Sequence, residues 1–404
     1  MMPRKIPSYI LVSAIFAMFS LSVLYSNLVI FSLDSYKPRL PYWDLNAGIN
    51  PLWNCFQESG LKLFLIDLNT FPSLETCRNF NYGYFSLASF GIFNLITTNA
   101  TFWGVLQILV FSILVTKSYF FKMNKSKMIF ATLALFSPGI FLLEASGNMD
   151  IQIVILLLFS VLLFQNKREK LSLTLICITA LFKFYTSPLL LILTFLTKEK
   201  GSKKYGIFLI IATAATILYQ MIHTPIPPFP AGAQNKFGAM IFGNYARKAG
   251  VDISQGQGEF LGILLVLIML VIMFFLHRTT DQRMVQSYSI HNDFLPLNFL
   301  ILSGAAIVCY ITALSVDYRL TFVALAGIAL IQFNQVQIKY VTKLFPYVWL
   351  SSLWFSFPFS LLSKYIGLDL QPIGDIAMVG TMSYFIFQSI FIFKLLRDKI
   401  EHQF

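Results

Sequence analysis

The chain has 404 residues, of which 57% are hydrophobic and only 12% are charged, and its mean hydropathy is +0.70. This balance is too apolar for a soluble globular protein and predicts an all-α, polytopic membrane protein. The formal net charge of +12 does not indicate a nucleic-acid partner, because the basic residues form short clusters between apolar runs and no nucleic-acid-binding module is recognisable.

Twelve apolar runs predict about 12 transmembrane helices in a single integral-membrane domain, residues 1–404. The first run follows the basic segment MMPRKIPSY and is long enough to span, so we expect a retained helix and not a cleaved signal peptide. The runs at 171–186 and 187–197 are short and meet near Pro188, which predicts tilted or half-buried helices. The expected spans are 8–32, 101–121, 128–146, 150–165, 171–186, 187–197, 205–223, 259–277, 294–314, 317–334, 343–363 and 376–396.

Two long polar segments are expected on the same side of the membrane. The first outer loop covers 33–100, and its apolar part at 82–99 is expected to lie as a helix at the membrane surface. The second outer loop covers 224–258. With the N-terminus inside, most of the 30 Lys and Arg residues fall in the inner segments, as the positive-inside rule requires. An even number of crossings then predicts that both termini are cytoplasmic.

The first outer loop holds candidate catalytic acids. Asp34 and Asp44 follow the first span closely enough to be held near the membrane surface. Tyr42 and Trp43, beside Asp44, are typical interfacial anchors. A solvated role stays open for each acid, because a loop of this length carries several carboxylates in any case.

Cys55 and Cys77 share the same loop, which would face an oxidising compartment. A disulfide between them would contribute about 3 kcal/mol by chain-entropy arguments. Both cysteines could equally be free thiols.

Further polar residues lie at the predicted outer ends of later spans. An acid or base within hydrocarbon costs roughly 2.5–3.5 kcal/mol, so such residues usually face a cavity and often serve function. Simpler roles stay open: Asp317 and Arg319 could pair or cap a helix start, and Lys183 could extend to the interface. Asn148 and Asp150 could form a turn and a helix N-cap. The residues in question are Glu144, Asn148, Asp150, Lys183, Asp317 and Arg319.

Several common catalytic and transport motifs are absent from the sequence. It contains no Walker A loop, HExxH, GxSxG or CxxC, and its four histidines do not have metal-ligand spacing. ATP-driven transport and zinc-dependent hydrolysis are therefore not expected. We expect no metal site and no cofactor, while a divalent cation beside the acids of the first outer loop stays open.

Five short motifs together resemble a known family. They are WDLNAG with Asp44, NFNYGY with Tyr82, GNMD with Asn148 and Asp150, KFYTSP beginning at Lys183, and DYRL with Asp317 and Arg319. In this order the chain resembles the GT-C class of membrane glycosyltransferases, and particularly the polyprenol-phosphate-mannose-dependent glycosyltransferase family 87 and its bacterial relatives. Two details depart from the family pattern: Gly83 stands where proline is usual, and Lys-Tyr-Pro is interrupted as KFYTSP.

The resemblance implies a GT-C-like fold and the inverting transfer of a sugar from a polyprenyl-phosphate donor to a glycan or glycolipid acceptor. The site would face the periplasm or cell exterior, from a bacterial inner membrane. Asp44 is the first candidate for the general base and Asp34 the second. Cations would bind the donor phosphate, and the candidates are Lys183, Arg319, Arg247 and Lys248. The candidates for sugar or acceptor binding are Asn148, Asp150, Tyr82, Asp317 and Glu144.

The alternative is a lipid-linked glycan flippase or another secondary transporter. Such a protein would carry charged residues near the bilayer midplane and broken helices at matching positions in internal repeats. We find no internal repeat in the sequence. A scaffold role in envelope synthesis also stays open.

Overall fold

The structure is a computed structural model that describes residues 96–97, 99–120, 123–140, 143, 148–223, 238–239, 241–278, 294–312, 320–332, 338–356 and 370–401. The first predicted span and nearly all of the first outer loop lie outside these ranges. Within them every regular element is a helix and no strand occurs, which confirms the predicted all-α class for this part of the chain.

Several described helices are long and apolar enough to cross a membrane, so the chain is a multi-pass membrane protein. A hydrocarbon core about 30 Å thick requires about 20 helical residues. The total of 12 crossings stays a prediction. The five helices of sufficient length are α5 (Ala100–Tyr119), α11 (Lys200–His223), α13 (Gln255–Arg278), α14 (Phe294–Thr312) and α18 (Gln371–Glu401).

Other helices overlap predicted spans but have fewer than the roughly 20 residues that a crossing needs. The run predicted at 128–146 is interrupted, because α6 ends at Leu135 and a new helical turn begins at Pro138, whose ring cannot continue a helix interior. The bounds of these shorter helices are α6 (Lys125–Leu135), α8 (Asp150–Gln165), α9 (Glu169–Phe182), α10 (Ser187–Leu196), α15 (Leu320–Gln332) and α16 (Lys339–Phe355). A short amphipathic helix, α12 (Ile241–Lys248), precedes α13.

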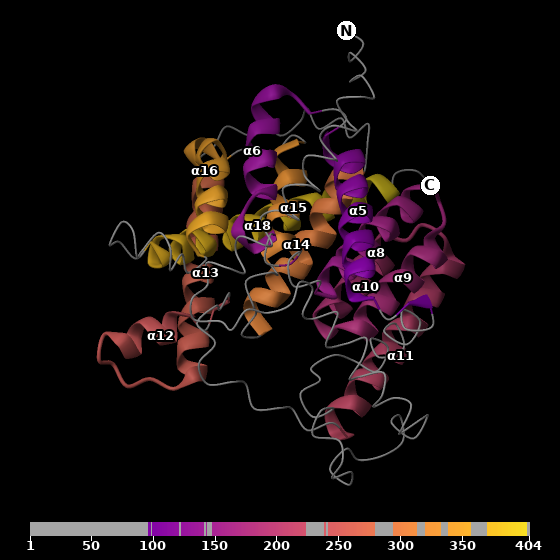
Figure 1. The fold of residues 1–404 in the computed structure, drawn as a ribbon, viewed down its shortest axis with the longest axis horizontal. Coiled ribbons are helices and arrows are strands. Elements are labelled where there is room, and N and C mark those ends of the chain that lie inside the picture. Colours follow the sequence, from indigo (N-terminus) through magenta and orange to yellow (C-terminus); the bar gives the residue numbers. More distant parts are fainter. Residues whose placement is uncertain are drawn as a thin grey trace. The chain divides into compact units, whose positions relative to one another are not determined.

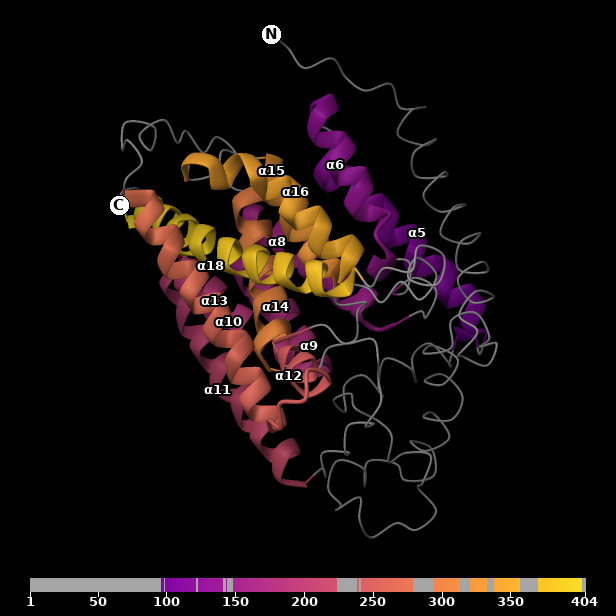
Figure 2. The ribbon, with the colours of Figure 1, turned by 90° about the vertical axis from the view of Figure 1, so that its left-hand side faces the viewer.

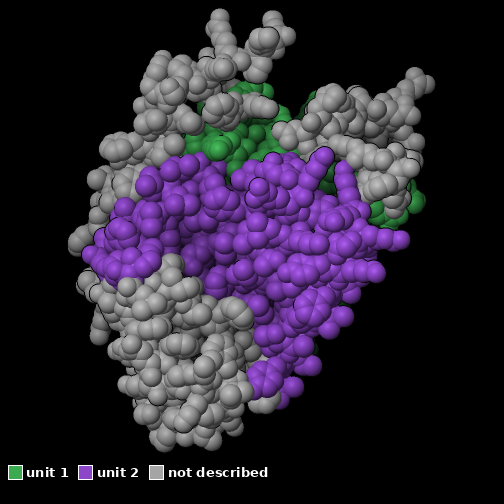
Figure 3. Space-filling view, turned by 90° about the vertical axis from the view of Figure 1, so that its right-hand side faces the viewer, with its two compact units in different colours: residues 1–11, 115–142, 233–404 green, residues 12–114, 143–232 purple. Residues whose placement is uncertain are grey.

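The chain divides into two compact units, coloured separately in Figure 3. Unit 1 comprises residues 1–11, 115–142 and 233–404, and unit 2 comprises 12–114 and 143–232. The single-domain organisation expected from the sequence stays a prediction.

In unit 2, α9 packs against α8, α10 and α11, and α10 packs against α11 (Figure 1). Two serines join α8 to α9: Ser160 Oγ donates to the Ser172 carbonyl at 3.0 Å, and Ser172 Oγ donates to the Ser160 carbonyl at 2.8 Å. Small residues at this contact let the two backbones approach closely, as is common between transmembrane helices. At Gly206 of α11, a Cβ would lie 2.5 Å from Thr194 Oγ1 of α10, so the close approach of these helices requires glycine.

In unit 1, α18 packs against α13, α14 and α16, while α15 packs against α6, α14 and α16 (Figure 2). The fully buried Trp349 of α16 donates from Nε1 to the Val323 carbonyl of α15 at 3.0 Å. Gly327 provides the space for this indole, because a Cβ there would lie 2.1 Å from Trp349 Cε2. The contact between α15 and α16 therefore depends on a tryptophan that fits over a glycine.

Candidate functional site

A buried ion pair joins the start of α8 to the end of α9. Lys183 Nζ lies 2.8 Å from Asp150 Oδ1, and the two side chains are 5% and 0% exposed. Asp150 is the first residue of α8, where the positive end of the helix dipole favours a carboxylate.

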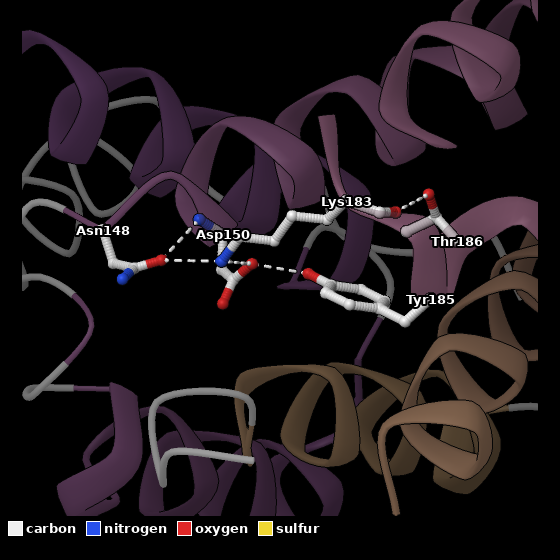
Figure 4. A network of polar contacts seen from close by, with 5 residues as sticks. All are labelled: Asn148, Asp150, Lys183, Tyr185 and Thr186. Carbon is white, nitrogen blue, oxygen red and sulfur yellow. Dashed lines mark hydrogen bonds and ion pairs between the residues drawn. The ribbon is translucent and has the colours of Figure 1, made fainter. Parts of the chain in front are cut away.

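Asn148 holds both members of this pair. Its Oδ1 accepts the backbone N–H of Asp150 at 3.0 Å and a hydrogen bond from Lys183 Nζ at 3.3 Å (Figure 4). The first of these contacts also satisfies one of the N–H groups that a helix start leaves without an intrahelical partner. Asn148 therefore shapes the turn into α8 and at the same time directs the lysine.

Lys183 lies at a break between two helices. Helix α9 ends at Phe182, the Lys183 backbone is extended (φ −145°, ψ 120°), and a 3₁₀ turn, η5 (Phe184–Thr186), leads into α10. The Lys183 carbonyl accepts both the backbone N–H of Thr186 at 3.2 Å and its hydroxyl at 3.0 Å. The predicted meeting of two spans near Pro188 thus takes the form of a four-residue break, Lys183 to Thr186, and Pro188 lies in the first turn of α10 that follows it.

The break also directs a tyrosine hydroxyl to the ion pair. Tyr185 donates its O–H to Asp150 Oδ1 at 2.5 Å. The Asp150 carboxylate oxygen is therefore contacted by an ammonium and by a phenol, and both donors come from the same break (Figure 4). The four residues Asn148, Asp150, Lys183 and Tyr185, called the polar cluster below, are 0%, 0%, 6% and 9% exposed.

The polar cluster and a set of exposed cations lie at opposite ends of the same helices. Helix α8 begins at the cluster and ends at Gln165, followed by the exposed residues Lys167 and Arg168. Helix α9 runs back from Glu169 to the cluster. With 16 residues, α8 is about 24 Å long. This length is somewhat less than the hydrocarbon thickness of a bilayer.

The structure brings together three residues that the sequence analysis singled out, namely Asn148, Asp150 and Lys183. Arg247 is exposed on α12, where its Nη2 donates to Asn244 Oδ1 at 2.7 Å. Arg247 belongs to unit 1, whereas the cluster belongs to unit 2. The backbone of Lys248 closes α12. The remaining candidates lie outside the described residues: Asp34, Asp44, Cys55, Cys77, Tyr82, Glu144, Asp317 and Arg319.

Tyr185 was not among the residues predicted for the site. It lies in the KFYTSP segment two residues after Lys183, and this motif was the available signal for it. A second polar contact was also missed, in unit 1: Tyr245 of α12 donates to Asp375, a 4% exposed aspartate in α18. Asp375 stands alone as an acid in a long apolar run, which was the available signal.

Among the described residues, no group of three or more His, Cys, Asp or Glu side chains could hold a metal ion. No protein-family model, curated protein sequence or solved structure matches the chain. The class of protein suggested by the five sequence motifs therefore stays a prediction. What the described site offers chemically is a carboxylate, an ammonium, a carboxamide and a phenol, held together in an otherwise apolar helix packing.

Proposed function

We propose that the protein is a membrane glycosyltransferase that transfers a sugar from a polyprenyl-phosphate donor to a glycan or glycolipid acceptor, with inversion at the anomeric carbon. The observation that carries this proposal is the buried polar cluster around the Asp150–Lys183 pair. Ionisable groups among transmembrane helices are costly and mark sites of function more often than sites of stability.

The depth of the cluster favours a ligand at headgroup level. Lys167 and Arg168, at the far end of α8, are typical of residues at a membrane surface. The cluster is about 24 Å along the helix from this end, while the hydrocarbon core is about 30 Å thick. It would therefore lie close to the opposite surface and away from the midplane, at the depth where a lipid-linked phosphate meets water.

In the proposed reaction, a carboxylate takes the proton of the acceptor hydroxyl as its oxygen attacks the anomeric carbon. The bond between that carbon and the phosphate oxygen breaks, and polyprenyl phosphate leaves. We assign the base to Asp44, with Asp34 as second candidate. Arg319 is the first candidate for binding the leaving phosphate, with Arg247 and Lys248 as reserves.

The contacts of Lys183 support a positioning role for it in this reaction. Its ammonium is buried and bonded to Asp150 and Asn148, so its charge is already largely balanced. We therefore propose that Lys183 and Asp150 fix the ends of α8 and α9, and that Tyr185 and Asn148 complete this support. A positioning role predicts that substitutions in the polar cluster alter kcat and KM together, because the ends of α8 and α9 shift.

One observation favours a second candidate function, a lipid-linked glycan flippase. The break between α9 and α10 has a buried cation at its first residue, and discontinuous helices with polar ends are a feature of secondary transporters. The depth of the cluster argues against this function, since transporter sites lie near the midplane.

The two functions are distinguished with the purified full-length protein in sealed liposomes. The liposomes carry a polyprenyl-phosphate mannose with a radiolabelled sugar, together with a lipid extract as acceptor. A transferase moves the label to a new lipid and releases polyprenyl phosphate. A flippase carries the intact labelled lipid from one leaflet to the other, and intact transfer without any cleavage would overturn the proposed function.

A further inference from the structure

The end of unit 2 opposite the polar cluster is strongly basic. Two turns form it, one between α8 and α9 and one between α10 and α11. These turns carry two acids, Glu169 and Glu199. The exposed cations of this basic end are Lys167, Arg168, Lys170, Lys198, Lys200, Lys203 and Lys204.

A buried glutamate fixes the two turns side by side. Glu169, 9% exposed at the start of α9, accepts the backbone N–H of Lys198 at Oε1 (3.0 Å) and that of Glu199 at Oε2 (3.2 Å). Lys170 Nζ lies 4.0 Å from the position that a Cβ on Gly201 would occupy. The hydrogen bonds of Glu169 thus hold the cations of both turns in one region.

Three lysines of this end share one face of α11. Lys200, Lys203 and Lys204 are three and four residues apart in its first turns, so their side chains emerge on the same side of the helix. All three are exposed. They are called the lysine turn below.

An exposed apolar stripe continues the same helix face. Ile207, Phe208 and Ile211 follow the lysine turn at the same helical spacing and are 49%, 63% and 64% exposed. Lys204 and Ile211 are seven residues apart, or about 10 Å along the helix axis. Cations followed along one face by apolar side chains match the order of groups in a phospholipid, with a phosphate first and acyl chains beyond it.

We propose that the basic end of unit 2 binds an anionic phospholipid, whose phosphate contacts the lysine turn and whose acyl chains lie along the apolar stripe. Charge complementarity selects an anionic over a zwitterionic headgroup, because a basic residue near an anionic membrane surface contributes about fivefold in affinity. The stripe selects a lipid over a soluble anion. This site is independent of the proposed transferase activity.

The test measures lipid binding to the purified full-length protein by native mass spectrometry, with phosphatidylglycerol and phosphatidylcholine as probes. Phosphatidylglycerol is expected to bind at least about tenfold tighter than phosphatidylcholine. The triple variant Lys200→Gln, Lys203→Gln, Lys204→Gln should lose about fivefold in phosphatidylglycerol affinity for each lysine and keep its phosphatidylcholine affinity. The single variant Lys203→Gln should show the one-lysine effect.

The matched control removes the same charge elsewhere, with the exposed residues Lys343, Lys394 and Arg397 of unit 1 changed to Gln. This control should bind phosphatidylglycerol as the unchanged protein does. Equal affinity for the two lipids, an equal loss in the control, or full competition by inorganic phosphate at the same concentration as the lipid would each overturn the proposal. So would tighter binding of an acidic peptide at the lysine turn than of phosphatidylglycerol.

Discussion

Lys183 Nζ lies 2.8 Å from Asp150 Oδ1, across a contact in which neither side chain is more than 5% exposed. The pair joins two helices that are otherwise held by apolar contacts and by the Ser160–Ser172 bonds. In such apolar surroundings, removing one charge lowers the free energy of unfolding by a different amount from removing both charges. Removing one partner leaves a charge buried without its counter-ion, whereas replacing both can be nearly neutral.

Lys183→Met is therefore expected to lower the free energy of unfolding by about 3–5 kcal/mol. The double variant Asp150→Asn, Lys183→Met should recover most of this loss, because neither charge is then left in the apolar packing. Thermal unfolding of the detergent-solubilised protein measures both effects. A double variant that is as unstable as the sum of the two single variants would contradict the pairing, and the exposed Lys204→Met serves as control.

Tyr185→Phe removes one hydroxyl from the polar cluster. A hydrogen bond to a charged group contributes about 1.5–3 kcal/mol, so the variant should unfold at a lower temperature by a corresponding amount. The control is Tyr347→Phe, since Tyr347 is 62% exposed in α16. If Tyr185→Phe and Tyr347→Phe both unfold at the same temperature as the unchanged protein, the hydroxyl of Tyr185 does not stabilise the cluster.

Glu169→Ala removes the acceptor of two backbone N–H groups before α11. Hydrogen exchange at the amides of Lys198 and Glu199 should become faster, because these groups then lose their protein acceptor. The control Asp252→Ala changes an exposed acid in the segment before α13 and should leave these amides unaffected. Unchanged protection in Glu169→Ala would show that the two turns are held together by other contacts.

Gly327→Ala places a methyl group against a buried indole. The new Cβ would lie 2.1 Å from Trp349 Cε2 and 2.3 Å from Nε1, so α15 and α16 must separate or Trp349 must leave its pocket. Overpacking of this kind costs about 1–3 kcal/mol or more. Gly256→Ala, with no atom within 4 Å of its Cβ position, should be neutral or slightly stabilising and is the matched control. Equal unfolding temperatures of the two variants would contradict the packing.

The helices could be predicted where apolar runs have clear ends. Helix α8 has the bounds 150–165 that the sequence predicts, since Asp150 precedes a continuous apolar run and the polar segment Asn166–Lys170 follows it. The end of α6 was missed, because Pro138 lies inside a run whose hydropathy shows no interruption. Hydropathy reports on burial in lipid and carries little information on backbone breaks.

The site could be predicted in part. Asn148, Asp150 and Lys183 stood out because polar residues are rare near the ends of apolar runs. Their mutual contacts could not be predicted, since Asp150 and Lys183 are 33 residues apart and pair only through the packing of α8 on α9. Tyr185, in the KFYTSP motif, and Asp375, a lone acid in an apolar run, each carried a signal in the sequence, but their partners could not be predicted, because tyrosines are common in this chain and their contacts depend on the helix packing.

The most direct test of the proposed transferase activity is the release of polyprenyl phosphate from a polyprenyl-phosphate mannose by the purified full-length protein. The unchanged protein should release it as the labelled mannose appears on an acceptor lipid. The Asp44→Asn variant should unfold at the same temperature and lose this release by at least about a hundredfold, as expected when a general base is removed. Near-normal release by Asp44→Asn would remove Asp44 from the role, and an unchanged protein that leaves the donor intact would contradict the account as a whole.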